Sequence, residues 1–391
     1  MICIGFASQA VASQPSFLTQ EHVAHSLVSE GDTTRLQRVL GQASEGKPVT
    51  IAFIGGSITQ GLKASVPQNR YVDLVGDWWK QTFPNSSLTI VNAGIGSTGS
   101  DYGTLRLNRD VLTKQPDLVF VDFAVNDKPT RELAETYEGL VRQLLHDPGQ
   151  PAVLLLFMVR NDGVNAQEWQ EKIGRHYHLP MISCRNALWP DIEAGRLAWN
   201  QIGGDYIHPN DAGHACVAAF IQHFIQRVID TPSHASGHKE NDVEPLPEPL
   251  LTGRFENVTL MEAADLKPVD NDGWRFDAES KAWTSQNPGS VVTFEVSGRQ
   301  IFLMQFRIHG PMGKVAVHVD DAAPVLFNGW LRPVTNGYRN TVLLARDLDP
   351  GPHRVRIELL EEKSPESSGH EFRLLGLGSA DSTASVSDVS K

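Results

Sequence analysis

The chain has 391 residues, 40% of them hydrophobic, and a formal net charge of −12 at pH 7. This length and apolar content predict two globular domains with short flanking segments. The acidic charge and the lack of a Lys/Arg-rich run argue against nucleic acid as a partner, and no apolar run approaches the roughly 20 residues of a membrane span.

The N-terminal segment, residues 1–30, has two open interpretations. Its short apolar stretch and the triplet Ala10–Ala12 resemble a signal cleavage region, but the basic start of a signal peptide is missing. A truncated export signal would place the protein in the periplasm or outside the cell, whereas a frayed N-terminus leaves a cytoplasmic location open. The cysteines show neither redox nor metal-ligand spacing, so we expect no disulfide framework and no zinc site.

Residues 31–231 are predicted to form a doubly wound α/β domain. Short strands that are apolar on both faces alternate with helix-length periodic segments, which is typical of a parallel sheet covered by helices. The predicted strands are VTIAFIG, LTIVNAG, DLVFVDFAV and AVLLLFMV, and the predicted helices cover about residues 32–43, 71–83, 132–146, 166–177 and 211–229.

The pattern changes after this domain. Residues 232–249 are rich in proline and charge and predict a linker. Residues 250–378 contain short alternating runs between turn residues, which predicts a smaller antiparallel β-sandwich. In that domain Val355, Ile357 and Leu359 should point inward. The small, polar residues 379–391 predict a disordered tail.

Ser57 follows the first predicted strand, and its surroundings argue against two familiar motifs. The spacing from Gly56 to Gly61 begins like a phosphate-binding loop, but Leu62 and Lys63 follow where that motif needs Lys and then Ser or Thr. A G-x-S-x-G nucleophile elbow is disfavoured, because Thr59 occupies its last glycine position and the segment follows the first strand of the domain. A serine in such a turn is most often structural, so a catalytic role requires partners elsewhere in the chain.

Candidate partners occur at later strand ends of the same domain. A glycine-containing segment with Gly96 and Ser97 follows the second strand, and Asn126 follows the third. Asp205 and His208 lie three positions apart just before the last helix. Each has an ordinary structural explanation, such as capping or a surface ion pair. The carboxyl ends of parallel strands share one edge of a sheet, so together they predict a common site.

These segments resemble the SGNH, or GDSL-like, hydrolase superfamily over Lys47–Ile229. The four family blocks appear in order as GGSIT, NAGIGSTGS, AVND and DYIHPN. The resemblance implies an α/β/α, flavodoxin-like fold. More narrowly, the chain is similar to bacterial carbohydrate esterases that remove acetyl groups and carry an appended β-domain.

The resemblance implies a serine esterase. Ser57 would be the nucleophile, His208 its general base and Asp205 the group that orients the imidazole. The oxyanion would be bound by the amides of Ser57 and of Gly96 or Ser97, together with the side chain of Asn126.

This chemistry needs no metal and no organic cofactor. The expected substrate is a small-molecule or polysaccharide ester, with O-acetyl groups on carbohydrate favoured. A lipid or thioester hydrolase and a sugar O-acyltransferase are the alternatives, and the sequence does not predict the oligomeric state. Sugar rings could stack on Trp274, Trp283, Trp330 or Tyr338 of the β-domain, or these side chains could pack in its core. This two-module interpretation predicts that a chain ending near Thr231 still cleaves small esters.

Overall fold

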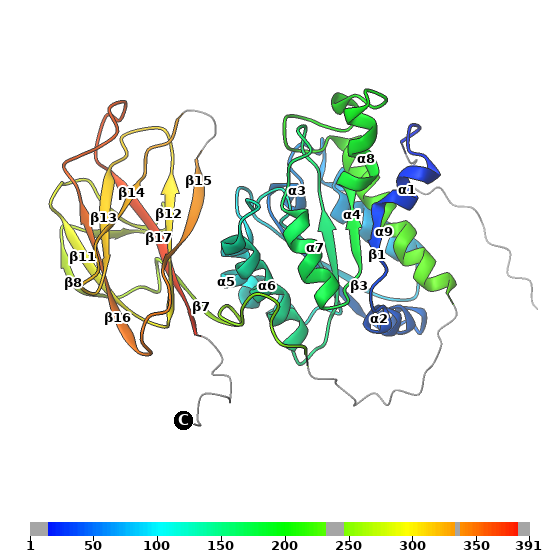
Figure 1. The fold of residues 1–391 in the computed structure, drawn as a ribbon, viewed down its shortest axis with the longest axis horizontal. Coiled ribbons are helices and arrows are strands. Elements are labelled where there is room, and N and C mark those ends of the chain that lie inside the picture. The colour runs from blue at the N-terminus through cyan, green and yellow to red at the C-terminus, as the bar shows by residue number, and fades with distance from the viewer. Residues whose placement is uncertain (1–14, 232–245, 333–336, 382–391) are drawn as a thin grey trace, which may run out of the picture. The chain divides into compact units, whose positions relative to one another are not determined.

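The computed structural model describes residues 15–231, 246–332 and 337–381. The chain divides into two compact units, each made of several segments. The first unit comprises Met1–Ile95, Asp110–Thr130 and Leu144–Glu248, and the second comprises Gly96–Arg109, Arg131–Gln143 and Pro249–Lys391. Both the predicted α/β domain and the predicted antiparallel β-domain are confirmed (Figure 1).

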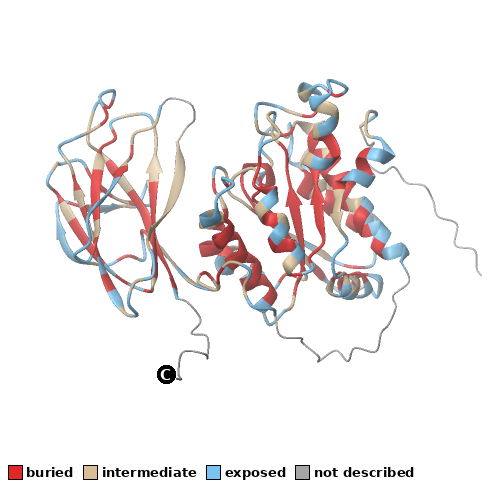
Figure 2. Cartoon of the chain, in the orientation of Figure 1, coloured by how far each residue is buried: buried red, intermediate tan, exposed pale blue. Residues whose placement is uncertain are grey.

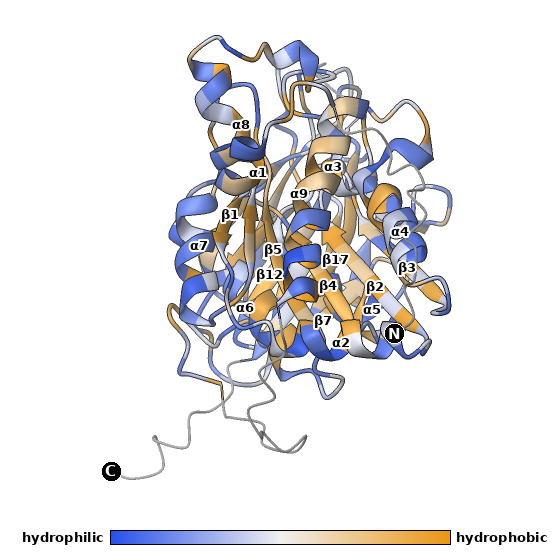
Figure 3. Cartoon of the chain, turned by 90° about the vertical axis from the view of Figure 1, so that its right-hand side faces the viewer, coloured by the Kyte–Doolittle hydropathy of each residue, from blue (hydrophilic) through white to orange (hydrophobic). Residues whose placement is uncertain are grey.

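A six-stranded sheet forms the centre of the first unit, in the order β1-β6-β5-β4-β2-β3. All neighbouring strands are parallel except β1, which is antiparallel to β6. The strands are almost entirely apolar because helices cover both faces, as Figure 3 shows for β2 and β4. Their bounds are β1 (Leu27–Ser29), β2 (Val49–Gly55), β3 (Leu88–Gly94), β4 (Leu118–Asp122), β5 (Ala152–Phe157) and β6 (Met181–Ser183).

The helices of the first unit include all those predicted within its segments, with small differences at their ends. Helices α1, α3 and α8 were not predicted. The bounds are α1 (Gln20–Ser26), α2 (Thr34–Ser44), α3 (Ser57–Gln60), α4 (Tyr71–Thr82), α7 (Gln167–His176), α8 (Cys184–Glu193) and α9 (Asp211–Asp230), with 3₁₀ turns η1 (Pro67–Asn69), η2 (Leu112–Lys114) and η3 (Trp199–Gln201).

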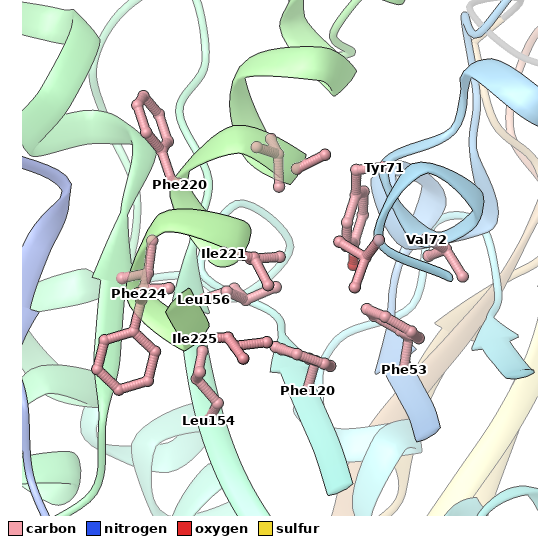
Figure 4. Close-up of a cluster of buried hydrophobic side chains, with 14 of the residues drawn as sticks. Phe53, Tyr71, Val72, Phe120, Leu154, Leu156, Phe220, Ile221, Phe224 and Ile225 are labelled. Carbon is pink, nitrogen blue, oxygen red and sulfur yellow. The ribbon is translucent and has the colours of Figure 1, made fainter. Parts of the chain in front are cut away.

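The core of the first unit lies between its sheet and helices α2, α4, α8 and α9. Phe53 of β2 stacks on Phe120 of β4 with ring centroids 4.6 Å apart (Figure 4). Both residues are fully buried, and the central strands of this sheet are buried along most of their length (Figure 2). Ile221 and Ile225 of α9 pack into the same cluster. The cluster holds β2 and β4, whose last residues Gly55 and Asp122 pair just before Ser57.

The second unit contains two antiparallel sheets that share one core. Val355, Ile357 and Leu359 are buried in it, as predicted. Sheet order is β15-β12-β17-β10-β9, with β7 on β17, and β14-β13-β16-β11-β8. The bounds are β7 (Asn257–Glu262), β8 (Pro268–Asp272), β9 (Arg275–Asp277), β10 (Ala282–Ser285), β11 (Val291–Ser297), β12 (Gln300–Arg307), β13 (Lys314–Val319), β14 (Val325–Asn328), β15 (Tyr338–Ala345), β16 (Pro352–Leu359) and β17 (Phe372–Asp381).

Two helices of the central chain also contribute to the second unit, namely α5 (Ser100–Asp110) and the first turns of α6 (Arg131–His146). The buried Glu138 of α6 accepts backbone N–H bonds from Leu250, Leu251 and Thr252 at 2.6, 2.8 and 2.9 Å. Residues 250–252, which precede β7, are thereby bound to a helix more than 100 residues earlier in the chain.

Packing reinforces these polar contacts. The fully buried Phe255 lies against Gly139, where an added Cβ would stand 2.4 Å from the Cβ of Phe255. Arg142 and Glu256 form an ion pair at 2.5 Å, with both side chains nearly inaccessible to solvent. Helix α6 and the segment 250–256 therefore form one packed substructure.

The structure describes only parts of the predicted N-terminal segment, linker and C-terminal tail. Residues 20–29 form α1 and β1 and join the first unit, so the segment 1–30 is partly built into the fold. Strand β17 continues to Asp381, three residues into the predicted tail. The triplet Ala10–Ala12, residues 232–245 of the linker and residues 382–391 lie outside the described residues. Within the described chain, no helix combines the length and apolarity of a membrane span.

Candidate active site

Three parallel strands end side by side and position Ser57. In the sheet register Gly55, the last residue of β2, pairs with Gly94 of β3 and with Asp122 of β4. Ser57 follows two residues after this level as the first residue of α3, and it is buried. The structure thus places Ser57 at the carboxyl edge of the sheet, the location predicted from the sequence.

Ser57, His208 and Asp205 form a continuous hydrogen-bonded chain. The Oγ of Ser57 lies 2.8 Å from Nε2 of His208. Both carboxylate oxygens of Asp205 lie 2.9 Å from Nδ1 of the same imidazole. With its proton on Nδ1, the imidazole donates to Asp205 and accepts from the serine hydroxyl. The structure thus brings together three side chains that the sequence analysis had grouped, across a separation of about 150 residues.

The loop that carries Asp205 and His208 is shaped by its own hydrogen bonds. The backbone N–H groups of Ile207 and His208 both donate to Oδ1 of Asp205 at 2.9 Å. Trp199 Nε1 donates to the carbonyl of Asp205, and the amide of Gly204 donates to the carbonyl of His208. The imidazole is therefore held on a closed turn before α9 begins.

These bonds also define the charge of Asp205. Its partial burial raises the pKa, but the backbone N–H bonds from His208 and Ile207 and the bond from the imidazole outweigh this effect and lower the pKa to about 2. Asp205 is consequently a carboxylate throughout the pH range in which an imidazole titrates.

Asn126 lies against the residue that precedes Ser57. A Cβ added to Gly56 would stand 2.2 Å from Oδ1, 2.5 Å from Cγ and 2.6 Å from Nδ2 of Asn126. The backbone of Asn126 turns directly after β4, with its N–H donating to the carbonyl of Phe123. Only glycine at position 56 leaves room for this side-chain amide, so Gly56 and Asn126 form a matched pair.

The glycine-containing segment after β3 carries the other two predicted residues, Gly96 and Ser97. Both belong to the second unit. Ser97 has a φ of 57°, in the left-handed region that few residues other than glycine adopt. Both amides remain candidates for the oxyanion site.

A buried polar network on the first unit was not predicted from the sequence. The hydroxyl of Thr59 donates to the carboxyl group of Asp122 at 2.8 Å and lies 2.8 Å from the hydroxyl of Tyr71. Burial raises the pKa of Asp122 to about 7, although the bond from Thr59 lowers it. The sequence signal was an acidic residue at the end of the otherwise apolar strand LVFVD, two residues before Ala124.

The aromatic residues proposed for sugar stacking divide into two groups. Trp274 is buried in the core of the second unit, and Trp283 packs on the same core while its Nε1 donates to the carbonyl of Ala263. For these two, packing is the correct interpretation. Trp330 and Tyr338 are half-buried, and Trp330 contacts His309 with ring centroids 5.7 Å apart.

Comparisons with known proteins identify the family. The model of the GDSL-like lipase/acylhydrolase family matches residues 53–216. Two solved structures of a two-domain esterase active on acetylated mannans, one of them co-crystallized with mannopentaose, are 32% identical to this chain; each covers 93% of this chain and 99% of its own, with a TM-score of 0.84. A search of curated proteins gives no match. This chain therefore belongs to the GDSL-like lipase/acylhydrolase family and is a carboxylic ester hydrolase.

Proposed function

We propose that this protein is a serine esterase that removes O-acetyl groups from carbohydrates through Ser57, His208 and Asp205. The observation that carries the catalytic part is the hydrogen-bonded chain from the Asp205 carboxylate through the imidazole to the Ser57 hydroxyl. A serine hydroxyl is a weak nucleophile at neutral pH and needs such an oriented base beside it.

In the proposed reaction, Ser57 Oγ attacks the ester carbonyl while Nε2 of His208 takes the hydroxyl proton. The negative charge on the tetrahedral intermediate is bound by N–H donors, namely the amides of Ser57 and of Gly96 or Ser97 and the side-chain amide of Asn126. The imidazolium then protonates the departing sugar oxygen, which leaves an acetyl-serine. His208 next activates a water molecule, and its attack releases acetate and restores Ser57.

The substrate class is inferred from the overall similarity. The two-domain esterase is active on acetylated mannans, and it matches this chain over both the α/β part and the β-sandwich rather than over a catalytic core alone. An acetylated polysaccharide is therefore the substrate class that we favour over lipid and thioester substrates.

The test measures acetate released from acetylated mannan and acetylated xylan, together with hydrolysis of 4-nitrophenyl acetate and 4-nitrophenyl octanoate. We expect activity on an acetylated glycan and on the acetate ester. Ser57→Ala and His208→Ala should each lower kcat by at least about 10³-fold, because the residues act as a unit. His223→Ala, at an exposed position of α9, is the matched control and should keep full activity.

Two results would overturn the proposal. Normal turnover by folded Ser57→Ala would exclude this serine as the nucleophile. A preference for octanoate without acetate release from any glycan would instead favour a lipid substrate.

A further inference from the structure

Tyr206 is an exposed aromatic side chain at the edge of the candidate active site. It stands between Asp205 and His208 in sequence, so its Cα lies within about 7 Å of that of His208. The residue is nevertheless 53% exposed, the largest exposure of any bulky apolar or aromatic residue in the described part of the first unit. Exposing a tyrosine ring in this way leaves a large apolar surface in water.

The ring is held in place from one side. The hydroxyl of Tyr206 donates to Oδ2 of Asp162 at 2.9 Å. Arg160 binds the same carboxylate with two N–H bonds of 2.9 and 2.5 Å, and its guanidinium carbon lies 6.0 Å from the centroid of the Tyr206 ring. The hydrogen bond from Arg160 holds the pKa of Asp162 well below its usual range, so this carboxylate acceptor is present at every pH of interest.

The turn that carries Tyr206 is closed by hydrogen bonds that do not involve its side chain. The turn from Gly204 to His208 is already closed by the bonds of its backbone to the Asp205 carboxylate and by the bond from Trp199. The side chain of Tyr206 takes part in none of them. Its ring is ordered by Arg160 and Asp162, and the same segment holds the loop through the N–H of Asn161, which donates to the carbonyl of Tyr206 at 3.1 Å.

Other exposed apolar side chains occur on neighbouring loops. In the described part of the first unit, the bulky apolar or aromatic residues that stay largely exposed are Tyr206, Leu62 (46%), Val66 (47%), Val164 (49%) and Ile229 (37%). All except Ile229 belong to loops at the carboxyl edge of the sheet. The loop of Leu62 and Val66 is bound through Ser65 to Asp211, just after the His208 turn, and Val164 donates its N–H to Asp162.

We propose that Tyr206 is a sugar-binding platform beside the scissile ester, with its ring stacking on a pyranose ring of the acetylated glycan. One face of a pyranose presents C–H groups, which carry partial positive charge and pack on the negative face of an aromatic ring. Arg160 and Asp162 fix the ring before the substrate arrives, so little side-chain entropy is lost on binding. This inference rests on the proposed function, because it names where that substrate's sugar binds.

The test compares the wild-type protein with Tyr206→Ala and Tyr206→Phe on an acetylated manno-oligosaccharide and on 4-nitrophenyl acetate. Tyr206→Ala should lower the ratio of kcat/KM for the oligosaccharide to that for the small ester about tenfold, equivalent to about 1.4 kcal/mol, mainly through KM. Tyr206→Phe keeps the ring and should retain most of the ratio. Ile229→Ala removes an exposed apolar side chain on α9 and should leave the ratio unchanged.

Each alternative outcome would overturn the inference in its own way. An unchanged ratio for Tyr206→Ala would show that the ring contacts no sugar. Tyr206→Ala and Tyr206→Phe could both lose activity, to the same extent on the manno-oligosaccharide and on 4-nitrophenyl acetate. That result would show that the hydroxyl only braces the loop. A selective loss on 4-nitrophenyl octanoate would assign the ring to the acyl chain. If the wild-type protein releases acetate from no glycan, the proposed function itself fails, and this result is separate from the other three.

Discussion

At the scale of single residues, the contact between Gly56 and Asn126 offers a test of the oxyanion site in which Asn126 itself is not mutated. Gly56→Ala would drive a Cβ into the side-chain amide of Asn126 and displace it. We expect both Gly56→Ala and Asn126→Ala to lower kcat by about 10²–10³-fold, with a smaller change in KM, because an oxyanion donor acts mainly in the transition state.

The matched control for this prediction is Gly41→Ala in α2, where an added Cβ meets nothing within 4 Å. It should keep normal kcat and gain helix stability, since alanine is favoured over glycine in a helix. If Gly56→Ala folds and turns over 4-nitrophenyl acetate at the wild-type rate, the amide of Asn126 is not an oxyanion donor.

Asp122 predicts a pH dependence of stability at the residue scale. Burial raises its pKa to about 7 in the folded protein, above the value of about 3.9 for an exposed aspartate. The folded state therefore binds more protons than the unfolded state between these values, and stability falls as the pH rises from about 4 to about 7. The neighbouring Tyr71 and Cys184 stay neutral there, because burial raises both of their pKa values.

Thermal unfolding at several pH values measures this effect. Asp122→Asn cannot ionise, so its Tm should fall less than that of the wild type between pH 4.5 and pH 8. Equal falls in the two proteins would assign the pH dependence to other groups, such as Asp101, whose pKa burial raises to about 6.

At the scale of secondary-structure elements, the stability of α6 depends on the carboxylate of Glu138. Its two oxygens accept three backbone N–H bonds from residues 250–252 inside the protein. Glu138→Gln keeps the shape but turns one acceptor into a donor, so at least one buried N–H loses its partner. We expect the free energy of unfolding to drop by about 3 kcal/mol.

Chemical denaturation of Glu138→Gln beside Glu132→Gln tests this prediction. Glu132 lies on the same helix, but its side chain is largely exposed and its partner Arg346 is 3.7 Å away. Such a surface ion pair contributes about 0–1 kcal/mol. Similar stabilities of the two variants would mean that the Glu138 bonds contribute little.

At the scale of the whole molecule, the contacts of α5 and α6 change the expected outcome of truncation. The two-module interpretation predicted small-ester turnover by a chain ending near Thr231. Such a chain would lack Phe255 and Glu256 and would expose the helical surface that they cover. Along the chain, α5 begins three residues after Ser97 and α6 begins five residues after Asn126.

We therefore expect the chain ending at Thr231 to have a lower Tm and to lose activity on 4-nitrophenyl acetate as well as on glycan. Circular dichroism and the small-ester assay measure the two effects. A truncated protein with the wild-type Tm and turnover would restore the interpretation of two separable modules.

The sequence by itself determined the four longer parallel strands of the first unit, the fold class and the choice of candidate site residues, whereas β1 and β6 were not predicted. Runs such as VTIAFIG and LTIVNAG became β2 and β3 with their predicted ends, because apolar β-branched stretches that stop at glycine have few other stable conformations. The order of the blocks then placed Ser57, Asn126, Asp205 and His208 along one sheet edge. Such local signals need no knowledge of distant contacts.

Only the tertiary structure decided which features depend on residues far apart in the chain. Burial in the folded chain raises the pKa of Asp122 to about 7, and Trp274 became a core residue because two sheets meet around it. Tyr206 was left exposed and ordered by Arg160 and Asp162, some 45 residues earlier. Burial and pKa are set by the neighbours that folding supplies, and no local pattern encodes which neighbours these will be.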